Sequence, residues 1–229
     1  MFLESKRIWM REVRHNDIAK GYYNWMQDPE VTANLESRYW PQSIDRIEEY
    51  ITSMKPPENV FLAIMLKGTS FTNGVTGKVD ILKTDKSEHT HLGNIRLGPI
   101  NWQHSFAEIG LVIGIKKLWG QGYGTEAISL VRYYAFSKLS LHKLTAGCYA
   151  TNPASIKAFK KAGFVEEGLL RRQYRTEQRQ WTDEVILGCL AEESYTWNKL
   201  QQIKTASSSN PYSFQLSPEA AEAIASQKE

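Results

Sequence analysis

The residues whose type and spacing are best suited to chemistry lie in the middle of the chain, where Gly120, Gly122 and Gly124 occupy alternate positions. A strand-like apolar run at 109–115 precedes these glycines, and a helix-like run at 126–139 follows them. A glycine-rich turn that opens a helix presents successive backbone N–H groups at the positive end of the helix dipole. Such turns bind phosphate and diphosphate groups. The segment therefore predicts a ligand that carries phosphate.

Two common phosphate-binding motifs do not fit this segment. A P-loop requires a Lys-Ser or Lys-Thr pair after its last glycine, and neither pair is present. A dinucleotide fingerprint has the spacing G-x-G-x-x-G and an acidic residue about 20 positions further on. Here the spacing is G-x-G-x-G, and the residues at that distance, 143–146, are Lys-Leu-Thr-Ala. For the segment taken alone, a glycine-rich turn without a ligand remains the alternative.

Together with its flanks, this turn resembles the acetyl-CoA site of the GNAT N-acetyltransferases. Gly122 and Gly124 match the family pattern (Q/R)-x-x-G-x-(G/A), whereas Trp119 stands at its Gln/Arg position. A second family segment, NPASIKAFKKAGF, runs from Asn152 to Phe164. The resemblance spans residues 8–190 and is strongest to the branch that contains the ribosomal-protein N-terminal acetyltransferases. It implies one α/β (α+β) domain, with a mixed central sheet of about seven strands flanked by helices and a splayed strand pair at the acetyl-CoA site.

Length and composition are typical of an ordinary globular protein with one domain. The 229 residues suffice for one well-buried domain, and 23% of them are charged against 41% hydrophobic. A net charge of +3 gives no reason to expect a nucleic acid or an anionic membrane as partner. The two cysteines lie in apolar runs, and the five histidines lack metal-ligand spacing, so free thiols and no metal are expected. Without a signal-peptide core or a membrane-length apolar run, the expected location is cytoplasmic.

Hydrophobic periodicity and turn residues divide the chain into strands and helices. Strands are predicted over 8–13, 60–66, 93–100, 106–114, 144–150, 164–174 and 182–190. Helices are predicted after a cap at Asn16 or Asp17, after a cap at Ser43, and over 126–139 and 153–162. The acetyltransferase domain is expected to span 1–198, with an insertion at 68–90 that holds a strand or hairpin arm near 75–82. Residues 199–229 are predicted to form a polar linker and a short C-terminal helix.

The resemblance assigns the contacts to acetyl-CoA, the co-substrate, to three parts of the chain. Backbone N–H groups of the turn bind the diphosphate, at Gln121, Gly122, Tyr123, Gly124 and Thr125. The backbone of one strand pairs with the pantetheine arm as an added strand would, at Leu111, Val112 and Ile113. Asn152 is the side-chain partner of the same arm.

Acetyl transfer from a thioester to an amine needs a neutral amine, a polarised carbonyl and a stabilised thiolate. Glu108 is the candidate general base, because several family members carry their catalytic glutamate here and its apolar neighbours predict partial burial. The alternative is a surface carboxylate paired with lysine or arginine. Many relatives place a tyrosine acid where this chain has Phe159, which cannot donate a proton. Ser155 is therefore the candidate that faces the leaving sulfur, with a simple helix-start role as its alternative.

The acceptor amine is expected between the first helices, the inserted segment and the last hairpin. The candidate side chains there are Trp25, Arg38, Tyr39, Arg172 and Tyr174. The stretch 35–38 resembles bacterial acetyltransferases associated with surface-polysaccharide amino sugars, and aromatic rings with arginines suit a sugar and a nucleotide diphosphate. The predicted acceptor is thus an amino sugar, free or nucleotide-linked. A protein N-terminus, another small amine such as a polyamine, and a non-catalytic acyl-CoA-binding module remain the alternatives, and a homodimer is left open.

Overall fold

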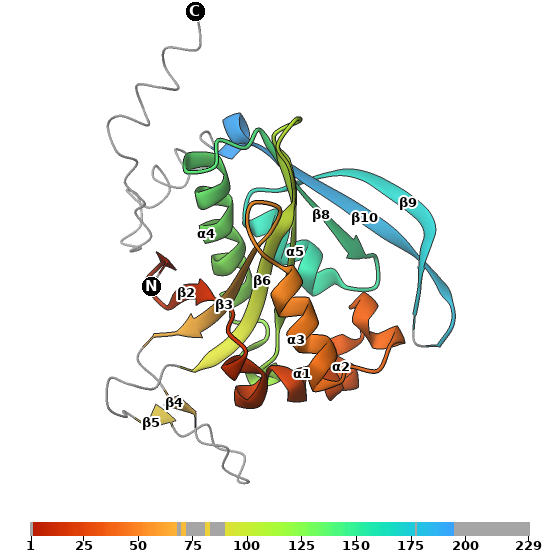
Figure 1. The fold of residues 1–229 in the computed structure, drawn as a ribbon. Helices are drawn as coiled ribbons and strands as arrows, with labels where there is room; N and C mark the ends of the chain where they lie inside the picture. Colours follow the sequence, from red (N-terminus) through yellow and green to blue (C-terminus); the bar gives the residue numbers. More distant parts are fainter. Residues whose placement is uncertain (1, 68–69, 72–80, 83–89, 177, 195–229) are drawn as a thin grey trace, which may run out of the picture.

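The computed structural model describes residues 2–67, 70–71, 81–82, 90–176 and 178–194. Its centre is an eight-stranded sheet with the strand order β1-β2-β3-β6-β7-β8-β10-β9 (Figure 1). The strands are β1 (Leu3–Glu4), β2 (Ile8–Glu12), β3 (Val60–Leu66), β6 (His91–Asn101), β7 (Phe106–Ile113), β8 (Lys143–Tyr149), β9 (Val165–Arg175) and β10 (Trp181–Leu190). Within this sheet β7 and β8 run parallel, and every other neighbouring pair runs antiparallel. The predicted mixed sheet flanked by helices is confirmed.

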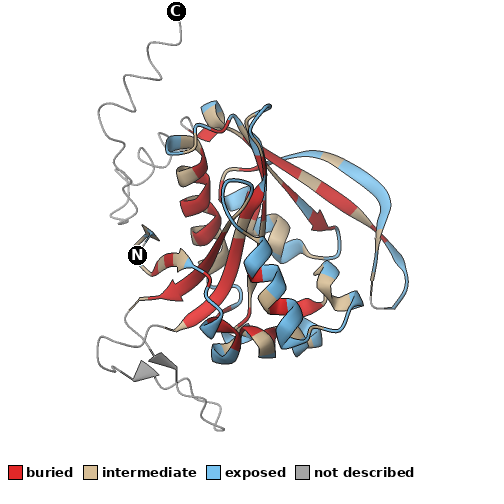
Figure 2. Cartoon of the chain, in the orientation of Figure 1, coloured by how far each residue is buried: buried red, intermediate tan, exposed pale blue. Residues whose placement is uncertain are grey.

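Helices cover both faces of the sheet (Figures 1 and 2). One face carries α4 (Tyr123–Ser137) and α5 (Pro153–Lys161). The other face carries the N-terminal helices and turns: η1 (Ile18–Tyr22), α1 (Tyr23–Gln27), α2 (Pro29–Thr32), η2 (Glu36–Tyr39) and α3 (Ile44–Ser53). The short turn η3 (Lys116–Leu118) leads from β7 to α4. Strand β3 therefore sends alternate apolar side chains into two separate clusters, which explains its unbroken hydrophobic sequence.

Three local predictions differ from the structure. The sheet has eight strands rather than about seven, because the two-residue β1 pairs with β2 and is too short to give a sequence pattern. Asp17 does not cap the first helix: its buried carboxylate instead binds the Arg11 guanidinium, with nitrogen–oxygen distances of 2.6 and 2.7 Å. The helix predicted at 126–139 begins earlier, at Tyr123. The cap at Ser43 is confirmed, since its Oγ accepts the N–H of Arg46 at 3.2 Å.

Two predicted segments lie largely or wholly outside the described residues. In the predicted insertion at 68–90, the structure describes β4 (Ser70–Phe71) and β5 (Ile81–Leu82), which pair antiparallel, together with Thr90. The predicted linker and helix at 199–229 fall entirely outside the described residues. None of the helices in the described part of the chain combines the length and apolar character needed to cross a bilayer.

Trp25, a predicted acceptor residue, lies in the core beneath the N-terminal helices. Its side chain is 8% exposed, and its ring meets the His91 ring at a centroid distance of 4.8 Å. It also lies directly over Gly114, where an added Cβ would come within 1.9 Å of the indole. The close approach of this ring explains why glycine follows β7, and it gives Trp25 a packing role.

Substitution of Gly114 by alanine is expected to destabilise the protein by about 1–3 kcal/mol, because the buried indole must shift to admit the methyl group. The control is Gly168→Ala on the edge strand β9, where an added Cβ meets nothing within 4 Å. Chemical denaturation of the two variants measures both free energies of unfolding. Equal stability of Gly114→Ala and the parent protein would contradict the packing described for Trp25.

Candidate active site

The strands β7 and β8 separate after a short parallel contact, as the predicted splayed pair requires. Residues 106–108 pair with 143–145, and no pairing joins the two strands beyond that point. β7 nevertheless continues to Ile113, paired with β6, and β8 continues to Tyr149, paired with β10. The β8-facing backbone edge of β7 at 109–113 is therefore not used by the sheet. An extended ligand can add there as a strand would.

The glycine turn lies beside the end of β7. Gly120 and Gly122 have φ angles of 74° and 85°, a left-handed conformation that favours glycine. Gly122 is the residue before α4, and no side chain caps this helix in the structure, so its first-turn N–H groups keep their hydrogen-bonding capacity. An ideal Cβ at Gly124 lies 3.4 Å from Cδ1 of Leu111 on β7, so the turn lies next to the strand whose edge is unpaired.

These observations fit a diphosphate followed by a pantetheine arm. The predicted turn residues, 121–125, surround the uncapped start of α4, and the predicted strand residues, 111–113, lie on the edge that β8 leaves unpaired. A Cβ at Gly120 would meet nothing within 4 Å, so the surface of the turn is open to a ligand. Trp119, where the family pattern has Gln or Arg, donates its indole N–H to the carbonyl of Ile113 at 2.7 Å. Trp119 thereby ties the turn to the end of β7.

On the opposite side of the splay, α5 begins at the end of β8. Asn152 caps α5, with its side-chain oxygen accepting the N–H of Ser155 at 3.2 Å. The cap leaves the amide NH₂ of Asn152 able to donate to a ligand. Ser155 Oγ lies 3.3 Å from Cys148 Sγ on β8, and burial raises the pKa of this thiol. Phe159 is 2% exposed and packs in the core, so it takes no part in proton transfer.

Glu108 lies at the point where β7 and β8 diverge, but the predicted partial burial is wrong. Its side chain is 49% exposed, and one carboxylate oxygen lies 3.5 Å from Nη2 of Arg96 on β6. Burial alternates along β7: Ala107 and Ile109 point into the hydrophobic core, so Glu108 between them points to the surface. The carboxylate can still reach a ligand that enters between the strands.

Arg38 and Tyr39 dock onto the last hairpin. The Arg38 guanidinium donates to the carbonyls of Ala33 and Arg175 and to the Tyr39 hydroxyl, and that hydroxyl donates to the Arg175 carbonyl at 2.9 Å. Arg38 also lies over the Tyr149 ring, 5.0 Å from its centroid. The end of β8 and the end of β9 are thus linked through one arginine.

A stacked pair of tyrosines joins β8 to β9 next to Arg38. The rings of Tyr149 and Tyr174 stack 4.2 Å apart at 13°. The Tyr149 hydroxyl donates to Glu36 at 2.5 Å, and the Tyr174 hydroxyl donates to the buried Glu184 at 2.7 Å. Burial, and then these carboxylates, raise the pKa of both tyrosines far above the ordinary value. Both hydroxyls therefore remain protonated donors at neutral pH.

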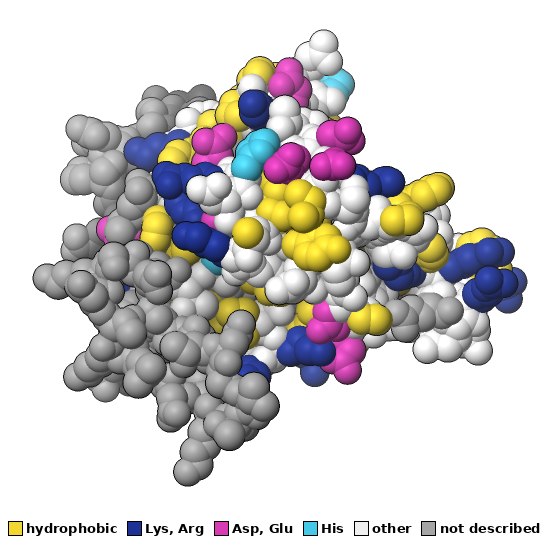
Figure 3. Space-filling model, turned by 60° about the horizontal axis from the view of Figure 1, so that its bottom comes forward, with side chains coloured by type: hydrophobic (Ala, Val, Ile, Leu, Met, Phe, Trp, Pro, Cys, Tyr) yellow, Lys and Arg dark blue, Asp and Glu magenta, His cyan; other side chains and the backbone are white. Residues whose placement is uncertain are grey.

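An open pocket of about 920 Å³ lies beside this stack. Three arginines and several aromatic and polar side chains surround it: Met26, Gln27, Pro29, Thr32, Ser37, Arg38, Tyr39, Trp40, Pro41, Gln42, Arg175, Thr176 and Arg179. Arginine side chains also gather on the projecting end of the β9–β10 hairpin, at the right of Figure 3. Of the predicted acceptor residues, Arg38 and Tyr39 line the pocket and Tyr174 lies in the adjoining stack. Trp25 and Arg172 do not line it; the backbone N–H of Arg172 binds Asp183 at 2.8 Å at a bulge of the hairpin.

Sequence reasoning missed Tyr149 and Glu184 as members of this region. Both were predicted only as strand residues, and their register, in which Glu184 pairs with Tyr149, places them on one face of the sheet. The available signal for Glu184 was its position directly before the apolar run that ends the final strand. Within the described residues, no group of three or more His, Cys, Asp or Glu is placed to hold a metal ion.

Comparison with known proteins relates this fold and this site to a family of enzymes. The family model of the acetyltransferase (GNAT) domain matches residues 7–165. YoaA of Bacillus subtilis (strain 168), an uncharacterized N-acetyltransferase, is 29% identical over 171 residues, which cover 74% of this chain and 86% of YoaA. The uncharacterized N-acetyltransferase p20 of Bacillus licheniformis is 32% identical over 177 residues, which cover 77% of this chain and 89% of p20. The crystal structure of spermidine N-acetyltransferase from Vibrio cholerae in complex with CoA and spermine has a TM-score of 0.64 and 19% identity, covering 82% of this chain and 98% of that chain.

The chain belongs to the GNAT acetyltransferase family. The matched residues include the splayed strands, the glycine turn and α5. Family membership makes the chain an acetyl-CoA-dependent N-acetyltransferase that acts on an amine. The likeness to the ribosomal-protein branch remains a prediction.

Proposed function

We propose that this enzyme acetylates the amine of an amino sugar, free or carried on a nucleotide diphosphate, by direct attack of the amine on acetyl-CoA. The observation that carries the choice of acceptor is the pocket lined by Arg38, Arg175 and Arg179 together with Tyr39 and Trp40. Guanidinium groups bind phosphates, and exposed aromatic rings pack against sugar faces. Arg38, which lines the pocket, also lies over the ring of Tyr149 at the end of β8, and this contact links the pocket to the splayed strands.

On the donor side, the chain contributes binding and orientation. Acetyl-CoA supplies the activated thioester carbonyl. The N–H groups of 121–125 bind the diphosphate at the start of α4, and the free edge at 111–113 pairs with the pantetheine arm, assisted by the Asn152 amide. Ser155 Oγ, in the first turn of α5, donates a hydrogen bond to the departing CoA thiolate and keeps its own proton.

On the acceptor side, Glu108 takes the amine proton, directly or through one water molecule. Its position at the divergence of β7 and β8 and its exposed carboxylate support this role. The hydroxyls of Tyr149 and Tyr174 donate to carboxylates, and their raised pKa values keep them protonated, so neither can take up the amine proton. They are assigned to orienting the acceptor.

A polyamine acceptor is the second candidate, favoured by the two carboxylates beside the tyrosine stack. Glu36 accepts the hydroxyl of Tyr149, and Glu184 accepts that of Tyr174. The negative charges of both carboxylates help to raise the pKa of Tyr174. The Vibrio cholerae relative was crystallised with CoA and spermine. The three arginines of the pocket oppose a polycation, so the amino sugar remains the first proposal.

The test is CoA release from acetyl-CoA across nucleotide-linked amino sugars, free amino sugars, N-terminal peptides and polyamines. Turnover restricted to amino sugars supports the proposal. Turnover restricted to peptides or polyamines keeps the chemistry and overturns the acceptor. Bound acetyl-CoA without turnover on any amine favours the non-catalytic module.

Replacement of Arg179 by glutamine tests the charge of the acceptor. Removal of one phosphate-binding cation is expected to raise KM for a nucleotide-linked amino sugar by about 10-fold. KM for a polyamine is expected to fall, because a repulsive charge is removed. Arg171→Gln is the control, since Arg171 is exposed on β9 but does not line the pocket. An unchanged KM for the sugar nucleotide in Arg179→Gln would contradict this use of the pocket.

A further inference from the structure

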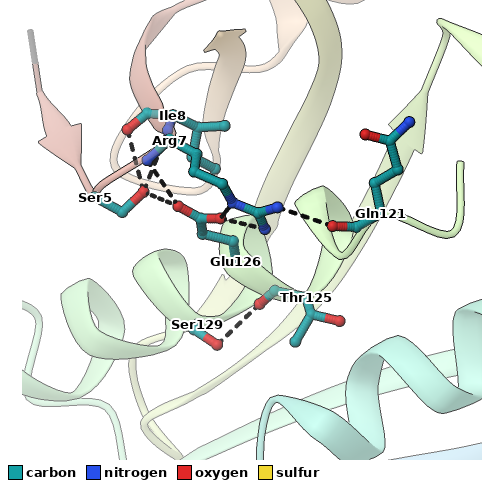
Figure 4. A network of polar contacts seen from close by, with 7 residues as sticks. All are labelled: Ser5, Arg7, Ile8, Gln121, Thr125, Glu126 and Ser129. Atoms are coloured by element: carbon teal, nitrogen blue, oxygen red, sulfur yellow. Dashed lines mark hydrogen bonds and ion pairs between the residues drawn. The ribbon is translucent and has the colours of Figure 1, made fainter. Parts of the chain in front are cut away.

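Arg7 lies against the glycine turn although more than a hundred residues separate them in the chain (Figure 4). It stands between β1 and β2, and its guanidinium lies over the Tyr123 ring, 4.5 Å from the centroid. Its Nη2 is 3.4 Å from the position that a Cβ on Gly122 would take. The glycine motif does not contain Arg7, and nothing in the family pattern quoted above includes it.

The main partner of Arg7 is Glu126 in the first turns of α4. Arg7 Nε and Nη2 each lie 2.6 Å from Glu126 Oε2, and the Arg7 backbone N–H binds Oε1 at 3.2 Å. Ser5 Oγ donates to the same Oε1 at 2.5 Å. The Glu126 side chain is only 8% exposed. A nearly buried carboxylate this close to the helix start would repel a diphosphate unless a cation balanced it.

Arg7 also fixes the orientation of one peptide in the turn. Its Nη1 donates to the carbonyl of Gln121 at 2.9 Å. In a trans peptide the carbonyl and the following N–H point in opposite directions. A Gln121 carbonyl held on Arg7 therefore turns the N–H of Gly122 to the other side of the turn, away from Arg7 and free for a ligand.

We propose that Arg7 is a positioning residue for the diphosphate of acetyl-CoA: it neutralises Glu126 and sets the Gly122 N–H for binding. This inference rests on the proposed donor site. The N-terminal segment thereby becomes part of the donor site without contacting the reacting atoms. The acetyl group and the pantetheine arm are bound by other residues, so the effect of Arg7 is confined to the nucleotide end of the ligand.

The experiment compares the binding of CoA and of pantetheine, which lacks the diphosphate, by isothermal titration. Arg7→Met is expected to weaken CoA binding by about 10- to 100-fold, the range for a lost charge-assisted contact, and to leave pantetheine binding unchanged. The double variant Arg7→Met/Glu126→Gln is expected to recover part of the CoA affinity, since the unbalanced charge is gone. It also guards against misfolding of the single variant, in which a buried carboxylate loses its partner.

Lys67→Met is the matched control. Lys67 binds Glu4 and the carbonyl of Ser5, so it anchors the same N-terminal segment without touching the glycine turn. Its CoA binding is expected to equal that of the parent protein. An equal loss for CoA and pantetheine in Arg7→Met, or an equal loss in Lys67→Met, would show a purely structural role, and undiminished CoA binding would overturn the inference. If the parent protein bound no CoA, the proposed donor site itself would fail, and the role of Arg7 with it.

Discussion

Gly122→Asp is expected to weaken acetyl-CoA binding by about 100-fold or more. The new carboxylate would lie against the bound diphosphate, and two like charges about 4 Å apart near a protein surface repel by about 4 kcal/mol. The residue also has a φ of 85°, where a side chain adds strain. In addition, the carboxylate would compete for Arg7, whose Nη2 lies 3.4 Å from the Cβ position. Titration with CoA measures the loss.

The matched control is Gly122→Asn, which has the same shape without the charge and tolerates the left-handed conformation better than most residues. It is expected to retain most of the CoA affinity. Thermal unfolding of both variants separates binding from stability. Normal CoA binding by Gly122→Asp would disprove the assignment of the glycine turn.

Glu108→Gln is expected to lower kcat by about 10²- to 10⁴-fold, the range for loss of a general base, while CoA binding stays unchanged. Glutamine keeps the size and the hydrogen-bonding capacity of the side chain but cannot take up a proton at neutral pH. Because Glu108 is exposed, its removal leaves no buried group unsatisfied, so the fold is expected to be preserved. Single-turnover kinetics with a saturating acceptor measure the chemical step.

The companion variant is Glu184→Gln, which changes the other carboxylate near the splayed strands. Glu184 is buried and bonded to Tyr174, so this change is expected to raise KM for the acceptor more than it lowers kcat. The reverse pattern, with full kcat in Glu108→Gln and loss in Glu184→Gln, would move the proton-accepting role to Glu184.

Local patterns were enough to predict the elements that form the proposed donor half of the site. The glycine turn, the strand before it and the cap of α5 are each encoded within a few consecutive residues. Their assembly follows from the β7–α4–β8 connection, which brings the turn to the end of β7. The early start of α4 at Tyr123 was missed because two glycines of the turn obscure the helical period there.

The acceptor half could not be predicted in the same way. Arg38 lies 137 residues before Arg175, and only tertiary docking joins them. Trp25 has the amphipathic character of a ligand-binding aromatic, but its burial depends on the close approach of Gly114. Glu108 has apolar neighbours in sequence, yet alternation along β7 turns its own side chain outward. For Arg38 and Trp25 the deciding contact comes from another element, whereas for Glu108 the alternation of its own strand decides.

The docking of Arg38 on the last hairpin joins two parts of the chain that lie on either side of the proposed acetyl-CoA site in sequence. Apart from Arg7, the proposed donor site comes from a continuous block from β7 to α5, whereas the pocket is lined by residues between 26 and 42 and by the final hairpin. Exchange of the side chains that line the pocket leaves this block and Arg7 in place. The residues around the pocket and those proposed to bind acetyl-CoA can therefore be changed separately by substitution.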